Sequence, residues 1–368
     1  MTWEPERLDD QRHLSEGDPG GMLPAVAASA AHVRTGYRNA VEARVDRLAG
    51  QGRPRAIVVA GMGGSGIAGD ILAAVVGNGA PLPIVTLRSY QLPGWVGATD
   101  LVIAVSGSGD TEETLAVATQ AVRRGCTLLA VGAPDSPLEA IATQASAVYV
   151  PVPVSGQSRA NLWLLAVPLV VAAAALRLVQ ADADLFERVA RSLEDMAHRC
   201  RPSSESFVNP GKSLAMHLAE GVPIIWGSSP AAAVAAYRLA CQLGANAKYP
   251  AIHGELPEVG HHQVALFDGP MAERDIFADT AGRTIRLVVL RDVEEHPQVT
   301  RRREASLRAA RERDVPVTEL TAEGVHPLER MAALIGLGDY ASTYLALGYA
   351  IDPTPVSAIT EVKARISQ

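Results

Sequence analysis

The chain has 368 residues, 48% of them hydrophobic and 20% charged, and its formal net charge is −7. This length predicts two domains of about 100–200 residues, and the composition excludes intrinsic disorder. The acidic balance argues against a broad surface for nucleic acid or anionic membrane, which needs clustered Lys and Arg. Cys126, Cys200 and Cys241 form neither a disulfide framework nor a CxxC metal site, so we expect a reducing compartment.

No segment of the sequence is typical of a targeting signal or a membrane span. Residues 1–10 are polar and acidic and lack the basic-then-apolar order of a signal peptide. Leu162–Leu176 is apolar throughout, but Pro168 interrupts it and it is shorter than the ~20 residues that span a bilayer. We therefore predict a buried core helix there, and a soluble, cytoplasmic protein.

The first half of the chain alternates short apolar runs with helical stretches such as Thr111–Arg124. Continuous apolar runs of this length are typical of strands that are covered on both faces. Together with helices in Gly21–Leu48, the alternation predicts a doubly wound parallel α/β sheet. The expected strands are Ala56–Ala60, Ile84–Leu87, Leu101–Val105, Leu128–Val131 and Val148–Val152.

The second half repeats this design less regularly, so we expect two similar α/β domains. We expect the boundary within the charged helix Asp184–Cys200 or just after it, at Arg201–Pro210. The predicted domains are 1–195, N-terminal helices plus the first domain, and 196–368, the second domain with a C-terminal helix. The expected later strands are Pro223–Trp226, Ile285–Leu290 and Val317–Leu320, and the expected later helices are Ala231–Leu243, Leu328–Leu347 and a short one after Asp352–Pro355.

A glycine-rich loop, Gly61–Gly66 (GMGGSG), directly follows the first predicted strand. It satisfies the GxGxxG dinucleotide pattern, but the same physics serves many phosphate sites, because glycines let backbone N–H groups approach an anion. A dinucleotide site wants an acidic residue after the second strand, which here ends in Arg88–Tyr90 (RSY). No GKS or GKT follows, so a P-loop is excluded.

A hydroxyl-rich loop, Ser106–Thr114 (SGSGDTEET), follows the third predicted strand. Several hydroxyl donors and a helix N-terminus at one point suffice to bind a phosphate monoester. Ser108, Asp110 or Thr111 could instead be a simple N-cap. Two such loops after neighbouring parallel strands favour a phosphate site, because open sheets bind ligands at the carboxyl ends of their strands.

These two loops resemble the sugar isomerase (SIS) domain, a flavodoxin-like doubly wound fold. The remainder resembles the bifunctional phosphoglucose/phosphomannose isomerases, which carry two SIS domains in one chain. The segments that carry this second resemblance are Gly156–Ala160 (GQSRA), Asn246–Ala251 (NAKYPA), Leu256–Glu258 (LPE), Asp339–Ala346 (DYASTYLA) and Asp352–Val356 (DPTPV).

The resemblance implies a cytoplasmic homodimer that binds a phosphorylated hexose and uses no cofactor or metal. It implies that the substrate phosphate is bound by Gly64, Ser65, Ser106, Ser108 and Thr111, and that Arg159 faces the sugar or an intermediate. It further implies catalytic roles for His261 and Lys363. Aldose–ketose isomerisation needs ring opening, a base that moves a proton between C1 and C2, and positive charge beside the enediolate.

The match fails at the base. The family has a glutamate sixteen residues before the histidine, and counting back from His261 lands on Ala245. Glu255 or Glu258 could supply the carboxylate instead, or His262 or His253 could act as base. Alternatively, catalysis is very weak or lost and phosphosugar binding remains, because losing a general base costs ~10²–10⁴-fold in rate.

Two further possibilities are disfavoured by the sequence. His253, Glu255, Glu258, His261 and His262 are residue types that bind zinc, but their spacing is not HExxH. A nucleotide-dependent oxidoreductase is disfavoured by the hydroxyl-rich loop. We therefore expect an isomerase that interconverts fructose 6-phosphate with glucose 6-phosphate, mannose 6-phosphate or both, and keep a non-catalytic phosphosugar-binding protein as the alternative.

Overall fold

The computed structural model describes residues 2–153, 156–272 and 284–366. The chain divides into two compact units, which we call the N unit (28–194 with 326–329) and the C unit (1–27, 195–325 and 330–368). The predicted division after residue 195 lies beside this boundary. The first 27 residues differ from the expectation, because they belong to the C unit rather than to the first α/β domain.

The N unit contains a five-stranded parallel sheet in the order β2-β1-β3-β4-β5. This is the flavodoxin-like order, with the topological switch point between β1 and β3. It confirms the predicted doubly wound fold. The strands are β1 (Ile57–Ala60), β2 (Ile84–Leu87), β3 (Leu101–Ser106), β4 (Thr127–Gly132) and β5 (Val148–Pro151).

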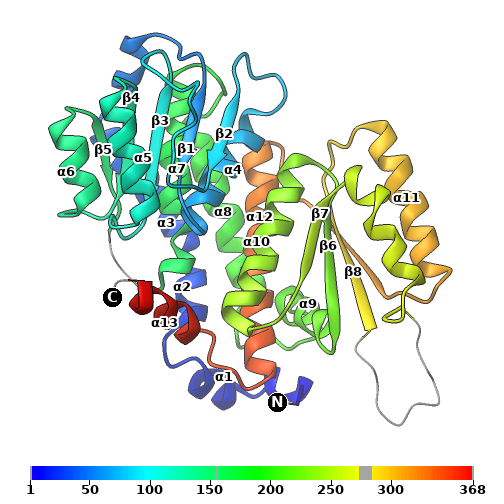
Figure 1. Cartoon of the computed structure of the whole chain (residues 1–368). Coiled ribbons are helices and arrows are strands. Elements are labelled where there is room, and N and C mark those ends of the chain that lie inside the picture. The colour runs from blue at the N-terminus through cyan, green and yellow to red at the C-terminus, as the bar shows by residue number, and fades with distance from the viewer. Residues whose placement is uncertain (1, 154–155, 273–283, 367–368) are drawn as a thin grey trace. The chain divides into compact units, whose positions relative to one another are not determined.

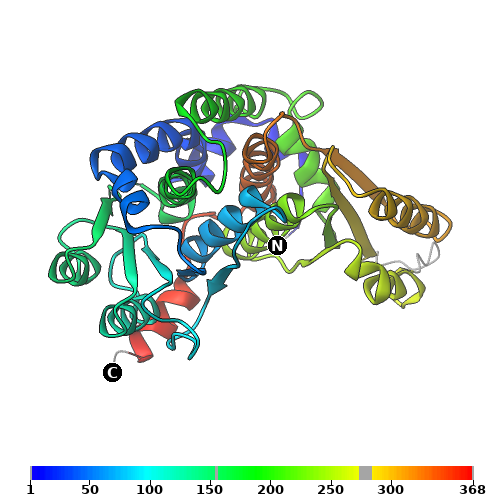
Figure 2. The ribbon, with the colours of Figure 1, turned by 90° about the horizontal axis from the view of Figure 1, so that it is seen from above.

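Helices cover both faces of this sheet (Figures 1 and 2). Val102 and Ala104 of β3 pack in a cluster with Val117 of α5 and Leu138 of α6. The alternate residues of β3 point to the opposite face, and the whole strand is buried, which explains its continuous apolar sequence. The helices of the N unit are α3 (Ser29–Glu42), α4 (Gly64–Val76), α5 (Glu112–Arg123), α6 (Pro137–Gln144), α7 (Leu162–Ala175) and most of α8 (Ala183–Arg199).

Helix α7 is the apolar segment that the sequence singles out. Among the described residues, Ser158–Ala175 is long and apolar enough to cross a membrane, but 67% of this stretch is buried inside the protein. Helix α7 packs against α3 and α4. The predicted buried core helix is therefore confirmed.

The C unit contains a four-stranded parallel sheet in the order β7-β6-β8-β9. Its strands are β6 (Gly221–Gly227), β7 (Ile252–Glu255), β8 (Thr284–Arg291) and β9 (Val317–Thr321). Its helices are α1 (Gln11–Gly17), α2 (Met22–Ala27), α9 (Pro210–Leu218), α10 (Pro230–Gln242), α11 (Pro297–Arg311), most of α12 (Pro327–Gly348) and α13 (Ser357–Ile366). The sequence had not indicated β7, α9 or α11.

Specific contacts explain why the first residues join the C unit. The Trp3 ring lies 5.2 Å from the Tyr349 ring. The carboxylate of Asp9 accepts hydrogen bonds from Ser206 and lies 3.3 Å from the buried Nζ of Lys212. An unpaired buried ammonium would be costly, so this contact ties the N-terminal segment to the start of α9.

We expect Asp339→Ala to destabilise the C unit strongly. Asp339 of α12 and Arg238 of α10 form an ion pair of 3.0 Å whose side chains are only 4% and 3% exposed. Removing one partner of a buried pair costs about 3–5 kcal/mol, which urea unfolding would measure. Glu16→Ala, which removes an exposed pair with Arg12, should cost under about 1 kcal/mol. Equal effects of the two substitutions would contradict this assignment.

Candidate functional site

The loop between β1 and α4 is shaped for an anion. A Cβ atom on Gly61 would lie 2.8 Å from the backbone of Ser65, so only glycine lets the chain return this closely. Gly63, the N-cap of α4, has φ +54°, which favours glycine, and no side chain caps the first turn of the helix. Backbone N–H groups without a cap at a helix N-terminus attract negative charge.

The hydroxyl-rich loop gathers its donors around Ser106, the last residue of β3. The Ser106 Oγ lies 2.8 Å from Thr111 Oγ1 and 3.4 Å from Ser108 Oγ, and it accepts a hydrogen bond of 3.0 Å from the Gly109 N–H. Ser108 donates to Asp110. Thr111 is the N-cap of α5, but its side chain does not cap the helix. Three hydroxyls therefore converge beside a second helix N-terminus.

Both loops lie at the switch point of the N-unit sheet. Strands β1 and β3 are neighbours, with Ala60 opposite Ala104, and both loops follow their carboxyl ends. This is where open α/β sheets bind ligands. The structure thus brings together, at one sheet edge, the loops that carry all five predicted phosphate ligands, Gly64, Ser65, Ser106, Ser108 and Thr111.

Arg159 lies in a short 3₁₀ turn, Ser158–Ala160, just before α7. His32 holds this turn, because its Nδ1 lies 3.3 Å from the Ala160 carbonyl oxygen; burial lowers the pKa of His32 and favours its neutral form. A Cβ on Gly107 would lie 3.8 Å from Leu165 of α7. The start of α7 therefore approaches the hydroxyl-rich loop, whereas contact of Arg159 with a sugar stays a prediction.

Arg88 is a cation beside the phosphate loops that the sequence reasoning did not select. It follows β2 and forms an ion pair with Asp70 of α4. A Cβ on Gly66 would lie 2.9 Å from its Nε, so the guanidinium packs against the first turn of α4. The sequence signal for Arg88 was its place directly after the second strand. That position had been considered only as the place of an acidic residue that binds the ribose of a dinucleotide.

The position of the missing glutamate lies in an irregular segment of the C unit. Ala245 is part of a π-helical turn, Leu243–Ala247, that follows α10, and such turns occur frequently at functional sites. The neighbouring Asn246 donates to Ser342 Oγ at 3.0 Å. Lys248 has φ +54°, and its Nζ donates to the Asp352 carbonyl. These contacts hold the backbone on either side of Ala245 in place, but the side chain of Ala245 is only a methyl group and cannot act as a base.

Glu255 ends strand β7, opposite Gly227 of β6. Surrounding atoms desolvate its carboxyl and raise its pKa above the usual value, although the residue as a whole is exposed. The segment after it packs closely, because a Cβ on Gly254 would lie 2.2 Å from Val259. Gln263 clamps this segment, accepting from Trp226 Nε1 at 2.6 Å and donating to the His253 carbonyl at 3.1 Å.

His261 and His262 are exposed on this clamped segment. His261 Nε2 lies 3.4 Å from Arg302 Nη1 of α11, and His262 Nε2 lies 3.9 Å from Glu258 Oε1. Within 2–153, 156–272 and 284–366, no group of three or more His, Cys, Asp or Glu residues is arranged to hold a metal ion. The zinc arrangement that the sequence left open is therefore not found there.

Lys363 lies on α13, whose side chains are all exposed. The candidate catalytic residues Glu255, Glu258 and His261 thus follow one another along one segment of the C unit, and Lys363 lies on a separate helix of that unit. The predicted phosphate ligands and Arg159 belong to the N unit.

Comparison with known proteins gives consistent results. Residues 207–366 match the bacterial phospho-glucose isomerase C-terminal SIS domain. The chain is 31% identical to the bifunctional phosphoglucose/phosphomannose isomerase of Caldicellulosiruptor bescii over 85% of this chain and 89% of that one. It is 28% identical to the same-named protein of Aquifex aeolicus over 85% and 91%. A crystal structure of a hypothetical protein from Thermus thermophilus shares the fold, with TM-score 0.72, 16% identity and coverage of 99% and 94%.

We expect Ser106→Ala to raise the dissociation constant for a hexose 6-phosphate by about 10–100-fold. A hydrogen bond to a charged group contributes about 1.5–3 kcal/mol, and Ser106 lies at the centre of the hydroxyl cluster. Isothermal titration calorimetry measures the change. Thr119→Ala, within α5, removes a hydroxyl that donates to the Leu115 carbonyl and should leave binding unchanged. Unchanged binding in Ser106→Ala would contradict the assignment.

Proposed function

The chain belongs to the bifunctional phosphoglucose/phosphomannose isomerase family, and from that premise we propose that it interconverts fructose 6-phosphate with glucose 6-phosphate and mannose 6-phosphate through an enediolate. The observation that carries the proposal is the pair of uncapped helix N-termini with the Ser106, Ser108 and Thr111 hydroxyls at the N-unit switch point. This arrangement suits a dianionic phosphate without a bound cation.

In the proposed reaction, the phosphate loops hold the phosphate of the substrate and leave its reacting carbons free for proton transfer. His261 transfers the proton that opens the ring. A base then takes the proton from C2 of the aldose and returns it to C1, which gives the ketose. Lys363 and Arg159 place positive charge near the enediolate oxygens as charge develops there. The proposal includes a cytoplasmic homodimer, as the resemblance implies.

We propose that Glu255 replaces the family's glutamate as the base. A carboxyl whose pKa is raised toward neutrality is a stronger base than an ordinary one, yet still ionises near neutral pH. Burial raises the pKa of Glu255, and its position is held by strand β7 and by the clamp at Gln263. Both glutamates are exposed, but Glu258, whose side chain is 77% exposed, lies after the strand and only 3.9 Å from the ring of His262.

The alternative function is non-catalytic phosphosugar binding, which Ala245 specifically favours. The first experiment is to incubate the purified protein with fructose 6-phosphate in D₂O and follow the products by NMR. Deuterium-labelled glucose or mannose 6-phosphate, lost in His261→Ala, supports the isomerase and identifies the epimer. Saturable changes in the ligand's signals without turnover over hours would support the alternative.

Glu255→Gln should lower kcat by about 10²–10⁴-fold, as expected for loss of a general base, with little effect on the Michaelis constant. Glu258→Gln is the matched control, because it makes the same change on another exposed glutamate three residues later, and its kcat should stay within about threefold. A coupled spectrophotometric assay in each direction measures both. Loss of activity only in Glu258→Gln would assign the base to that residue instead.

The pH dependence of kcat/KM should report the base. Glu255 acts when it is deprotonated, and its pKa is raised above the ordinary 4.5. Activity is therefore expected to fall as the pH drops through this raised pKa, by about tenfold for each further pH unit. The residual rate of Glu255→Gln should lack this acidic limb, whereas that of His261→Ala should keep it. A limb that persists unchanged in Glu255→Gln would contradict the role of this carboxyl.

A further inference from the structure

The two sheets correspond strand by strand, although only the N unit carries the glycine- and hydroxyl-rich loops. In the order β7-β6-β8-β9, strand β6 takes the place of β1 and β8 that of β3. Ser228 and Ser229 connect β6 to α10, as the glycine-rich loop connects β1 to α4. Asp292 directly follows β8, at the carboxyl edge of the C-unit sheet. Ser106, which ends β3, has the corresponding place in the N-unit sheet.

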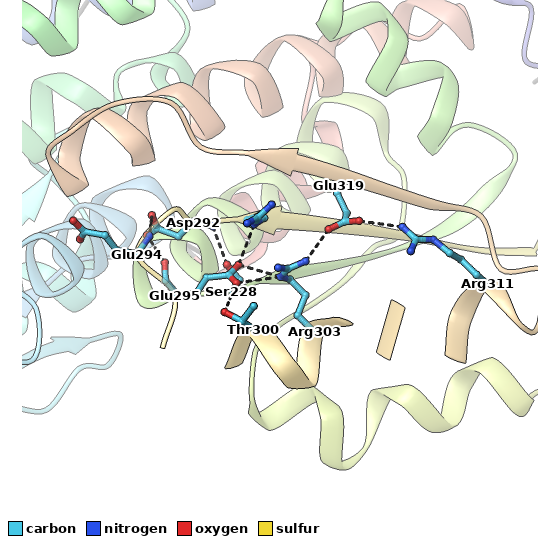
Figure 3. A network of polar contacts seen from close by, with 10 residues as sticks. Ser228, Asp292, Glu294, Glu295, Thr300, Arg303, Arg311 and Glu319 are labelled. Carbon is cyan, nitrogen blue, oxygen red and sulfur yellow. Dashed lines mark hydrogen bonds and ion pairs between the residues drawn. The ribbon is translucent and has the colours of Figure 1, made fainter. Parts of the chain in front are cut away.

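In the C unit this edge already holds a negative charge (Figure 3). Asp292 Oδ2 accepts a hydrogen bond of 2.7 Å from Ser229 Oγ, and its backbone N–H donates to Ser228 Oγ at 2.8 Å. Its Oδ1 lies 2.7 Å from Arg330 Nε. Asp292, Ser228 and Arg330 are 3%, 2% and 2% exposed, so the carboxylate is enclosed.

The helix beside this carboxylate differs from its counterpart in the N unit. Ser229 caps α10 by accepting from the Ala232 N–H at 3.1 Å, while its own proton goes to Asp292. The serine thus links the helix N-terminus to the carboxylate. Helix α4 begins at Gly63 without a side-chain cap. The N-terminus of α10 is therefore capped by a side chain of the chain itself, whereas that of α4 has no side-chain cap.

Further contacts of the arginine hold the network together. Arg330 Nη1 donates to the Val325 carbonyl, and Nη2 lies 2.7 Å from Glu294 Oε2. The start of α12 is thereby bound to the segment that follows β8. The network continues through Glu295, Arg303 and Glu319. Asp292 is the member that touches both the arginine and the cap of α10.

We propose that Asp292 is a built-in anion at the carboxyl edge of the C-unit sheet, where the phosphate loops lie in the N unit, and that this edge of the C unit therefore takes no sugar phosphate. The Asp292 carboxylate has a hydroxyl donor, Ser229, and a guanidinium, Arg330, around it, which are the kinds of group that bind an anion. The correspondence with a phosphate site rests on the proposed function of the N-unit loops. The contacts of Asp292 are independent of that function. The duplicated domain then keeps the anion-binding architecture as a structural element.

The first test counts binding sites. Isothermal titration of the full-length wild-type protein with fructose 6-phosphate is expected to give one site per chain, which Ser106→Ala weakens by about 10–100-fold. Two sites per chain, or one that Ser106→Ala leaves unchanged, would overturn the proposal. A wild-type protein that binds no sugar phosphate would instead contradict the proposed function and leave the next test standing.

The second test removes the Asp292 carboxylate by mutation and supplies a small carboxylate, formate, in the buffer. Asp292→Ala leaves a space of the size of formate, so sodium formate should raise its unfolding temperature by about 2–4 °C or more relative to sodium chloride of equal ionic strength. The wild type and Asp292→Asn, whose amide fills the space, should show no formate-specific shift. Absence of a shift in a folded Asp292→Ala protein would overturn the proposal.

Asp339→Ala is the matched control. It removes an equally buried carboxylate from an arginine, but in the middle of α12 and away from any helix N-terminus. Its formate-specific shift should be clearly smaller than that of Asp292→Ala. Equal shifts would assign Asp292 to ordinary ion pairing and overturn the proposal. If Asp292→Ala does not fold, the count of sites in the wild type still decides.

Discussion

The structure depends on one electrostatic constraint, the positive ends of helices at the carboxyl edge of a parallel sheet. Each βα connection aims backbone N–H groups at this edge, and these groups need a partner. In the N unit, Gly63 leaves the start of α4 without a side-chain cap, and hydroxyls of the next loop gather beside it. In the C unit, Ser229 caps the corresponding helix and donates its own proton to Asp292.

The difference between the two helix N-termini accompanies a division of proposed roles between the two α/β units. The N unit keeps the features that suit a sugar phosphate, and the C unit carries the residues proposed for proton transfer. Glu255 is the last residue of β7, and His261 lies on the segment that follows it. Gln263 holds this segment against the sheet by its hydrogen bonds with Trp226 and the His253 carbonyl. The clamp matters because a general base must be held in a defined geometry. Glu255, at the end of a strand, meets that requirement better than Ala245, whose methyl group cannot accept a proton.

Much of the fold could be predicted, for identifiable reasons. Strand β3 is buried on both faces, and its unbroken apolar sequence marked it. Strand β7 was missed because it is an exposed edge strand of sequence IHGE. Helix α11 was missed because its apolar residues are few among arginines, such as Arg302 and Arg303. Residues 1–27 were placed with the wrong sheet because their contacts with Ser206, Lys212 and Tyr349 are distant in sequence.

The sequence by itself determined the fold class, the position of both loops after their strands and the absence of the family's glutamate at Ala245. These are local properties, because strand burial, glycine conformation and hydroxyl chemistry are written in consecutive residues. Only the tertiary structure decided that Arg88 packs against α4, that burial raises the pKa of Glu255, and that Asp292 meets Ser229 and Arg330. Desolvation and ion pairing depend on neighbours from distant segments, and the packing of the whole unit selects those neighbours.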